Sequence, residues 1–178
     1  TAQRARRHLD DDPAAAGAQL DLVEQEASRA GAHLRGILAS LAEPAKDMDL
    51  ENEARILASM LAARSPICTD VLVSGTPRAL APDVCGVLAS VVGEGLHNVE
   101  KHANAKCAIV SLHYGVSDIS VTIQDDGHGL RGKPVLSRPS ANGCGRGLLS
   151  LRKRVERLGG KLGIRALDGG GTALRASI

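Results

Sequence analysis

A helical pattern between Asp83 and His102 constrains the fold more than any other feature of the chain. Apolar side chains recur there with the spacing of a helix that buries one face, and not with the alternation of a strand. They are Val84, Val87, Leu88, Val91, Val92, Leu96 and Val99. A stripe of this kind has to be covered, so we expect the rest of the chain to supply a second layer.

Three polar residues of the same helix, Glu94, Asn98 and Lys101, are four and three residues apart, so they stack along one line of its surface. At about 100° per residue, that line runs along the edge of the buried face. A carboxylate, a carboxamide and an ammonium group at this edge can border a cavity without being stranded in the core. The alternative is a solvated helix face, because isolated surface charges contribute little to stability.

The residues around this helix predict a mixed sheet. Apolar alternation and β-rich composition predict five strands, at Ile67–Val73, Cys107–Tyr114, Ile119–Gln124, Lys161–Ala166 and Thr172–Ile178. Two more helices are expected, a short one around Leu50–Ala63 and a core-facing one from Leu148 to Leu158. Because helices and strands are interleaved but join mostly as hairpins, we predict an α+β fold, a two-layer sandwich with helices on one face of the sheet.

The first 44 residues predict a separate helical element. Between Ala14 and Glu43 the apolar residues are spaced alternately by three and four, which is a heptad seam and requires a partner helix. We expect a helical hairpin that forms a four-helix homodimer; the alternative is an amphipathic helix lying on its own domain. We therefore divide the chain into a hairpin (1–44), a connector (45–65) and a main domain (66–178). The chain begins with Thr1 and not with Met, which suggests a fragment of a longer protein.

Composition argues against several classes of function. The net charge is only +2, and the single aromatic residue is Tyr114, so neither a basic surface nor stacking platforms for nucleic acid are expected. The four cysteines are scattered without a C-x-x-C pair, which disfavours zinc and favours reduced thiols. The sequence contains no membrane-spanning run and opens with no signal peptide, so we expect a cytoplasmic location.

Two glycine-rich segments are candidates for ligand binding. Asp125-Asp126-Gly127-His128-Gly129 follows a strand, where the glycines let the backbone approach a ligand and Asp125 can accept a hydrogen bond from an amino group such as that of adenine. The alternative is an ordinary Asp-Gly turn.

The second segment, Gly143–Leu148, leads straight into a helix. Glycine amides at a helix N-terminus form an anion site, and Arg146 adds positive charge. The alternative is a flexible loop that happens to precede a helix. Residues 131–146 are rich in Gly, Pro and Ser, so we expect a mobile loop there, disordered without a ligand. Further on, Thr172 opens the last strand after three glycines, where it could reach a ligand or simply close a hairpin.

Two familiar nucleotide motifs do not fit. Gly127–Gly132 formally satisfies the dinucleotide fingerprint G-x-G-x-x-G, but Lys133-Pro134 follows where that motif needs a helix. The Walker A motif is absent, because neither Gly132-Lys133 nor Gly160-Lys161 is followed by Ser or Thr. A dinucleotide oxidoreductase is therefore disfavoured.

Taken in order, the motifs resemble a known family. They are E-x-x-x-N-x-x-K-H-A from Glu94, D-D-G-x-G from Asp125, G-x-G-L from Gly145 and G-G-T ending at Thr172. This set is similar to the ATP-binding domain of sensor histidine kinases, a member of the GHKL superfamily with the Bergerat fold, over about residues 66–178. The short lid, the K-H-A ending and the missing phenylalanine box resemble the NarX- and DesK-like subfamily. Residues 1–43 would then be the end of its dimerisation and phosphotransfer hairpin.

The resemblance implies ATP and Mg²⁺ as cofactors, with roles for the residues of the central helix. Asn98 would hold the metal, Glu94 would polarise a water or help to order the metal shell, and Lys101 and His102 would face phosphate. Phosphoryl transfer of this kind works by positioning and charge neutralisation.

The resemblance also implies a purine end and a phosphate end for the two glycine-rich segments. Asp125 would bind the adenine amino group, Gly127 and Gly129 would make room, and Thr172 would support the adenine end. The 130–144 segment would be the ATP lid. The phosphate end would be the helix start formed by Gly145, Arg146, Gly147 and Leu148.

The resemblance implies an ATP-dependent histidine kinase that passes the phosphoryl group to an aspartate of a response regulator. In the subfamily the acceptor histidine is followed by an acidic residue, whereas leucine follows both His8 and His33. We therefore expect the acceptor upstream of Thr1. A related GHKL serine kinase or anti-sigma binding module is the alternative, and the heptad helix at 14–43 argues against it.

Overall fold

The computed structural model describes residues 49–130 and 146–178. The predicted heptad helix at 14–43 and the predicted lid at 130–144, apart from Leu130, lie outside the described residues. The described residues belong to one compact unit, Asp47–Ile178.

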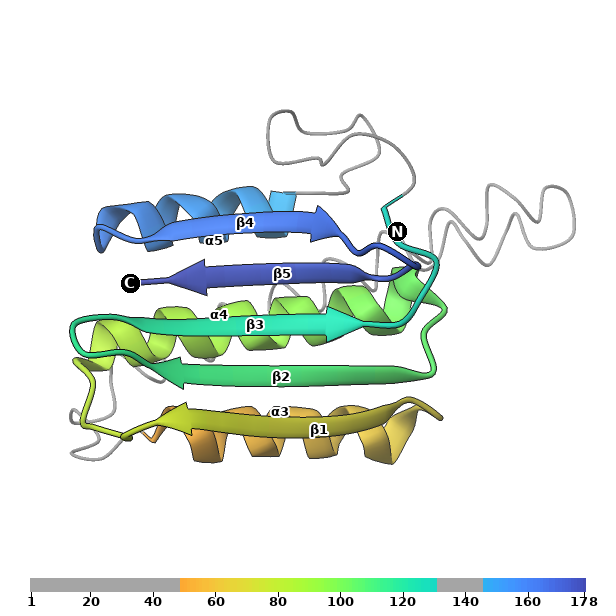
Figure 1. Cartoon of the computed structure of the whole chain (residues 1–178), viewed down its shortest axis with the longest axis horizontal. Helices are drawn as coiled ribbons and strands as arrows, with labels where there is room; N and C mark the ends of the chain where they lie inside the picture. Colours follow the sequence, from red (N-terminus) through yellow and green to blue (C-terminus); the bar gives the residue numbers. More distant parts are fainter. Residues whose placement is uncertain (1–48, 131–145) are drawn as a thin grey trace, which may run out of the picture. The chain divides into compact units, whose positions relative to one another are not determined.

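A five-stranded mixed sheet forms one layer of this unit (Figure 1). Its strands are β1 (Cys68–Gly75), β2 (Cys107–Tyr114), β3 (Ile119–Asp125), β4 (Lys161–Ala166) and β5 (Thr172–Ser177). Their order across the sheet is β1-β2-β3-β5-β4; β1 and β2 are parallel, and the other neighbours are antiparallel. All five predicted strands are confirmed, two of them to the residue. The parallel pair arises because a helix connects β1 to β2, whereas hairpins connect β2 to β3 and β4 to β5.

Three helices, α3 (Leu50–Arg64), α4 (Pro82–Asn98) and α5 (Arg146–Arg157), cover one face of the sheet (Figure 1). The strands alternate accordingly: in β2, Ala108, Val110, Leu112 and Tyr114 are buried, while Cys107, Ile109 and His113 are exposed. The predicted two-layer α+β sandwich is therefore confirmed. No helix among the described residues is both long and apolar enough to span a bilayer.

The central helix differs from its prediction near its end. The α-helix ends at Asn98, and the chain continues as a π-helix, η1 (Val99–Ala103), where a continuous α-helix to His102 was expected. Asn104 follows with φ 50° and ψ 40°, a left-handed conformation that asparagine tolerates better than most residues. A π turn holds more residues than an α turn, so Lys101 no longer continues the α-helical line of Glu94 and Asn98.

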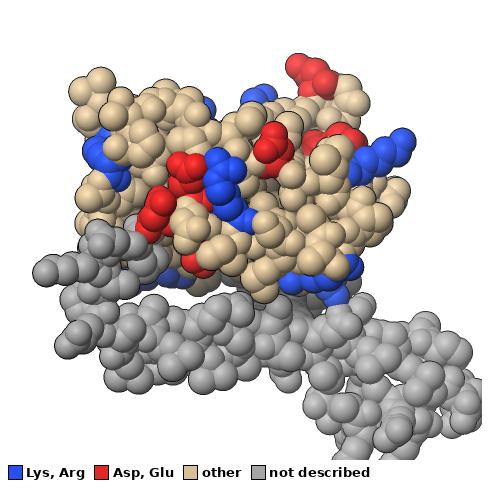
Figure 2. Space-filling view, turned by 90° about the horizontal axis from the view of Figure 1, so that it is seen from below, with Lys and Arg blue, Asp and Glu red and all other residues tan. Residues whose placement is uncertain are grey.

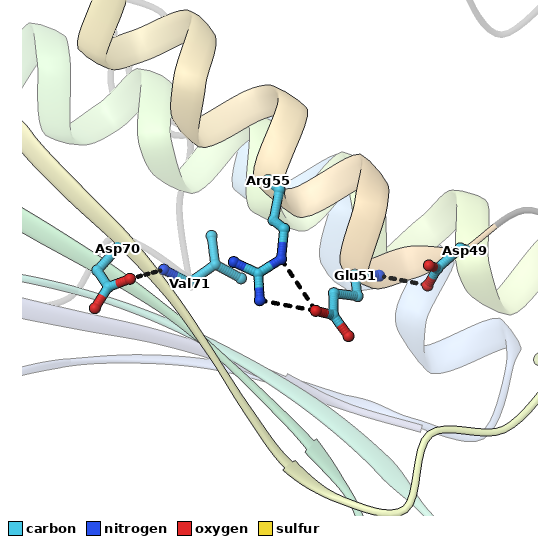
Figure 3. Close-up of polar contacts among 5 residues, drawn as sticks. All are labelled: Asp49, Glu51, Arg55, Asp70 and Val71. Atoms are coloured by element: carbon cyan, nitrogen blue, oxygen red, sulfur yellow. Dashed lines mark hydrogen bonds and ion pairs between the residues drawn. The ribbon is translucent and has the colours of Figure 1, made fainter.

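Helix α3 begins at a side-chain cap and is tied to the end of the central helix. The Asp49 carboxylate accepts a hydrogen bond from the Glu51 amide at 3.0 Å, and Arg55 pairs with Glu51 at 2.8 Å (Figure 3). Arg64 donates two hydrogen bonds, of 2.9 and 2.8 Å, to Glu100 of η1. Acidic and basic side chains are intermingled on the face shown in Figure 2, so this face has no patch of one sign.

The apolar stripe of α4 packs against the middle of the sheet. Leu88, Val91 and Val92 are fully buried, as the helical spacing predicted. Gly95 lies against the side chain of Ile123 in β3, where an added Cβ would come within 2.9 Å of Ile123 Cγ1. Because Gly95 follows Glu94 directly, this close contact also fixes where the polar edge of the helix lies.

Gly95→Ala is expected to lower the free energy of unfolding by about 1–3 kcal/mol, since the added methyl group overpacks the core against Ile123. Gly93→Ala is the matched control, because the nearest atom to its new Cβ is 4.0 Å away. The control should stabilise the protein by up to about 1 kcal/mol through helix propensity. Urea unfolding of both variants measures the two effects; changes of the same sign would contradict the packing of α4 on β3.

Candidate functional site

The carboxylate of Glu94 lies against the N-terminal turn of α5. A Cβ added to Gly147 would overlap both the Glu94 carboxylate oxygens and its Cδ. The two residues are far apart in the sequence, and Arg154 of α5 reaches back to the Ser90 hydroxyl of α4 at 3.4 Å. The structure therefore brings together the polar edge of the central helix and the glycine-rich helix start. Glycine is required at 147 because the backbone and the carboxylate share this space.

Asn98 lies one helical turn beyond Glu94, at the last residue of α4. Its side-chain nitrogen is buried and has no hydrogen-bond partner among the described residues. Leaving such a group unpaired costs about 1–3 kcal/mol. A buried, unpaired N–H donor at the edge of a helix is the kind of exception that indicates a place for a hydrogen-bond acceptor, such as an oxygen atom of a ligand.

Lys101 and His102 lie on η1, and both are exposed. Lys101 is not isolated, because it already interacts with another group of the protein. Both residues therefore lie shortly after Asn98, on the π turn that continues the central helix. Lys101 does not lie on the predicted α-helical line.

Asp125 ends β3 and is buried, with 8% of its surface exposed. Its carboxylate accepts a hydrogen bond from the Gly127 amide at 2.9 Å and another from the backbone N–H of Thr172, the first residue of β5. Burial raises the pKa of the Asp125 carboxyl group above its ordinary value, and the two amide hydrogen bonds only partly oppose this shift. The predicted acceptor is therefore held between its own turn and the start of β5.

The glycines of this turn allow three backbone segments to meet. A Cβ on Gly127 would overlap the Ala103 carbonyl at the end of η1, and the His128 amide donates to the same carbonyl at 3.0 Å. Gly171, with φ +88°, packs directly against the Asp125 carbonyl. Gly129 has φ +72°, a conformation that other residues rarely adopt. The turn after β3 is thus enclosed by the end of the central helix and the start of β5.

Asp126 has a structural role that the sequence reasoning missed. Its carboxylate accepts hydrogen bonds from the amides of Lys106 and Cys107, at 2.8 and 2.9 Å. These hydrogen bonds hold the pKa of Asp126 below its ordinary value. The adjacent pair of aspartates could have suggested this division of roles. The carboxylate of Asp125 is buried at the site, and that of Asp126 anchors the turn to the start of β2.

The remaining predicted site residues are described only in part. Thr172 is half-buried, and Leu148 is half-buried and packed against the core. Arg146 is the first residue of α5, but its side chain and the whole of Gly145 lie outside the described residues. A shallow hollow on α5, lined by Ser150, Lys153, Glu156 and Arg157, includes no predicted site residue.

The opposite pKa shifts of the two aspartates predict opposite pH dependences of stability. The pKa of Asp125 is higher in the folded than in the unfolded protein, so its carboxyl group favours folding at low pH and loses that contribution as pH rises through the folded pKa. Between about pH 7 and pH 4, wild type should therefore gain stability relative to Asp125→Asn.

Relative to Asp126→Asn, wild type should instead lose stability on acidification, because the pKa of Asp126 is lowered in the folded state. Urea unfolding of the three proteins at each pH measures both differences. A pH-independent difference for Asp125→Asn would contradict the burial of its carboxylate.

Parts of this chain resemble known proteins. A curated relative, the signal transduction histidine-protein kinase/phosphatase UhpB of Salmonella typhimurium, is 37% identical over 82 residues. That match covers 46% of this chain and 15% of the relative, so the chain spans only a small part of that protein.

Solved structures show the same fold. The histidine kinase domain of the blue-light activated histidine kinase EL346 of Erythrobacter litoralis has a TM-score of 0.57 and 25% identity, over 79% of this chain and 67% of that one. The ATP-binding domain of PrrB from Mycobacterium tuberculosis has a TM-score of 0.55 and 19% identity, over 71% of this chain and 90% of that one.

The family of histidine kinase-, DNA gyrase B- and HSP90-like ATPases matches residues 86–178, just over half of the chain. This segment runs from α4 to the end of the chain and contains every predicted site residue. The chain therefore belongs to this family of ATPases.

Proposed function

We propose that this chain is the catalytic region of a two-component sensor histidine kinase, which transfers the γ-phosphate of ATP to a histidine and from there to an aspartate of a response regulator. One observation carries the proposal furthest: the buried carboxylate of Asp125, held by two backbone amides at a glycine-lined turn. A carboxylate has more lone pairs than these two amides occupy, so it can also accept a hydrogen bond from the amino group of adenine.

At the purine end, Asp125 accepts the hydrogen bond from the adenine amino group. Gly127 and Gly129 would leave room for the base because neither carries a side chain. At 127, glycine is also required by the packing of the turn, since a Cβ would collide with the Ala103 carbonyl. Thr172 supports the same end, since its backbone N–H orients the Asp125 carboxylate. Because backbone amides already fix the orientation of the Asp125 carboxylate, adenine would bind without any movement of this group.

At the phosphate end, the resemblance to sensor histidine kinases implies a magnesium ion that neutralises the phosphates. Asn98 would hold the ion through its amide oxygen, which is a ligand type that Mg²⁺ accepts. The described residues contain no cluster of three or more His, Cys, Asp or Glu side chains that could hold a metal by themselves. When bound, the ion would neutralise charge on the phosphates.

Residues near the two helix ends would position the phosphates. Glu94 polarises a water or orders the metal shell, while Lys101 and His102 face the phosphate groups. The backbone amides at the start of α5, which include those of Gly147 and Leu148, would attract negative charge through the helix dipole. The amide of Gly145 and the side chain of Arg146 are proposed to contribute to the same phosphate site. The contact between Glu94 and Gly147 supports this role, because it brings the helix edge and the helix start together.

The domain organisation belongs to the same proposal. Residues 1–44 would be the end of a dimerisation and phosphotransfer hairpin of the NarX- and DesK-like kind, 45–65 a connector and 66–178 the catalytic domain. The same proposal includes a homodimer formed through this hairpin, a response regulator as partner and a position in the cytoplasmic part of a sensor. Finding a histidine followed by an acidic residue upstream of Thr1 in the full gene would favour this proposal over a GHKL serine kinase.

Asn98→Ala is expected to remove the Mg²⁺ dependence of ATP binding, because the proposed metal ligand is lost. Calorimetric titration with ATP, with and without Mg²⁺, measures this dependence. Asn52→Ala is the matched control, since Asn52 is exposed on α3 and should leave the dependence unchanged. An Asn98→Ala variant with the wild-type response to Mg²⁺ would argue against the metal role.

Asp125→Asn is expected to weaken ATP binding about 10- to 100-fold, the value of a hydrogen bond to a charged group of about 1.5–3 kcal/mol. Binding of GTP, which lacks the adenine amino group, should change much less. Asp168→Asn, at an exposed position between β4 and β5, is the control. Equal losses for both nucleotides would indicate a damaged fold and not a lost adenine contact.

A further inference from the structure

Two cysteines lie opposite each other at the start of the parallel strand pair. Cys68 is the first residue of β1, Cys107 is the first residue of β2, and the two are register partners. Both are exposed and reduced, whereas the third described cysteine, Cys85, is buried in α4. The edge strand β1 and its neighbour β2 run side by side in Figure 1, with the cysteine pair at their beginning.

The geometry of a parallel strand pair suits a disulfide at this position. Neighbouring strands lie about 4.7–4.9 Å apart, and partners in register project from the same face of the sheet. A disulfide accepts Cα atoms about 4.4–6.8 Å apart, and the spacing of neighbouring strands lies within that range. Both side chains are exposed, so the two thiols project from the same open face of the sheet.

We propose that Cys68 and Cys107 are a redox modification site, which forms a reversible disulfide across β1 and β2 on the exposed face of the sheet. A metal site is disfavoured, because no third His, Cys, Asp or Glu completes such a cluster among the described residues. The inference does not depend on the proposed nucleotide binding.

A small disulfide such as oxidised glutathione suffices as the oxidant. The thiolate of Cys68 attacks one glutathione sulfur, forms a mixed disulfide and releases one glutathione thiolate. The Cys107 sulfur then attacks the Cys68 sulfur and displaces the second glutathione. The two cysteine protons pass to the two leaving thiolates, so the protein loses two electrons and the glutathione disulfide gains them.

The cross-link would enclose the segment that carries Glu94 and Asn98. The chain between Cys68 and Cys107 contains all of α4 and η1, so a disulfide closes a loop around the central helix. The amide of Cys107 also donates to Asp126, which anchors the turn after β3. Closing this loop lowers the conformational entropy of the unfolded chain. Oxidation is therefore expected to stabilise the folded protein.

The test treats the full chain with oxidised glutathione, alkylates the remaining thiols and maps the peptides by mass spectrometry. We expect a peptide in which Cys68 is linked to Cys107 within one chain, and its loss on addition of dithiothreitol. The urea midpoint of wild type should rise on oxidation and return on reduction. Cys68→Ser and Cys107→Ser should show neither change, whereas Cys144→Ser should behave as wild type.

Three results would overturn the proposal. One is full alkylation of both cysteines after oxidation, and another is a lasting mixed disulfide with glutathione. The third is linkage of either cysteine to Cys144 or to a second copy of the chain, which non-reducing electrophoresis of dilute samples would reveal. A Cys68–Cys107 link that left the urea midpoint unchanged would contradict the loop-closure effect.

Discussion

The packing of one helix against one strand determines the positions of the other parts of the site. The apolar stripe of α4 is buried against the sheet, and Gly95 lets the helix come close enough to contact Ile123 of β3. This contact sets the rotation and depth of α4. The rotation directs Glu94 and Asn98 to the edge of the buried face, where polar groups can meet a ligand. Overpacking at Gly95 would therefore disturb the site as well as the core.

The candidate site is assembled from segments that are distant in the sequence. The end of β3 supplies a buried carboxylate, and the start of β5 donates an amide to it. The end of η1 accepts the His128 amide, and the start of α5 approaches Glu94. At each of these junctions glycine is present because two backbones, or a backbone and a carboxylate, are too close for a Cβ. All of these junctions lie within residues 86–178, the segment that matches the ATPase family.

Much of the fold followed from periodicity. The predicted strands Cys107–Tyr114 and Lys161–Ala166 are confirmed to the residue, because their alternation reflects one buried and one exposed face. The π-helix at Val99–Ala103 was not predicted, because a π turn is stabilised by what packs around it and leaves no clear signal in apolar spacing. The role of Asp126 was also missed, since its partners are distant in the sequence: the amide of Cys107 at the start of β2 and that of Lys106 just before it. The roles of the individual site residues stay predictions.

The sequence by itself determined the layer composition, the strands and α-helices of the described residues, and the neighbouring positions of Glu94 and Asn98 on the central helix, because these depend on local spacing. The tertiary structure alone decided which distant groups meet: Glu94 with Gly147, Asp125 with Thr172 and Cys68 with Cys107. It also decided the order of the strands and the parallel pairing of β1 with β2. The physical reason is that spacing fixes which face of an element is buried, whereas the register between elements is fixed only when their buried faces pack together.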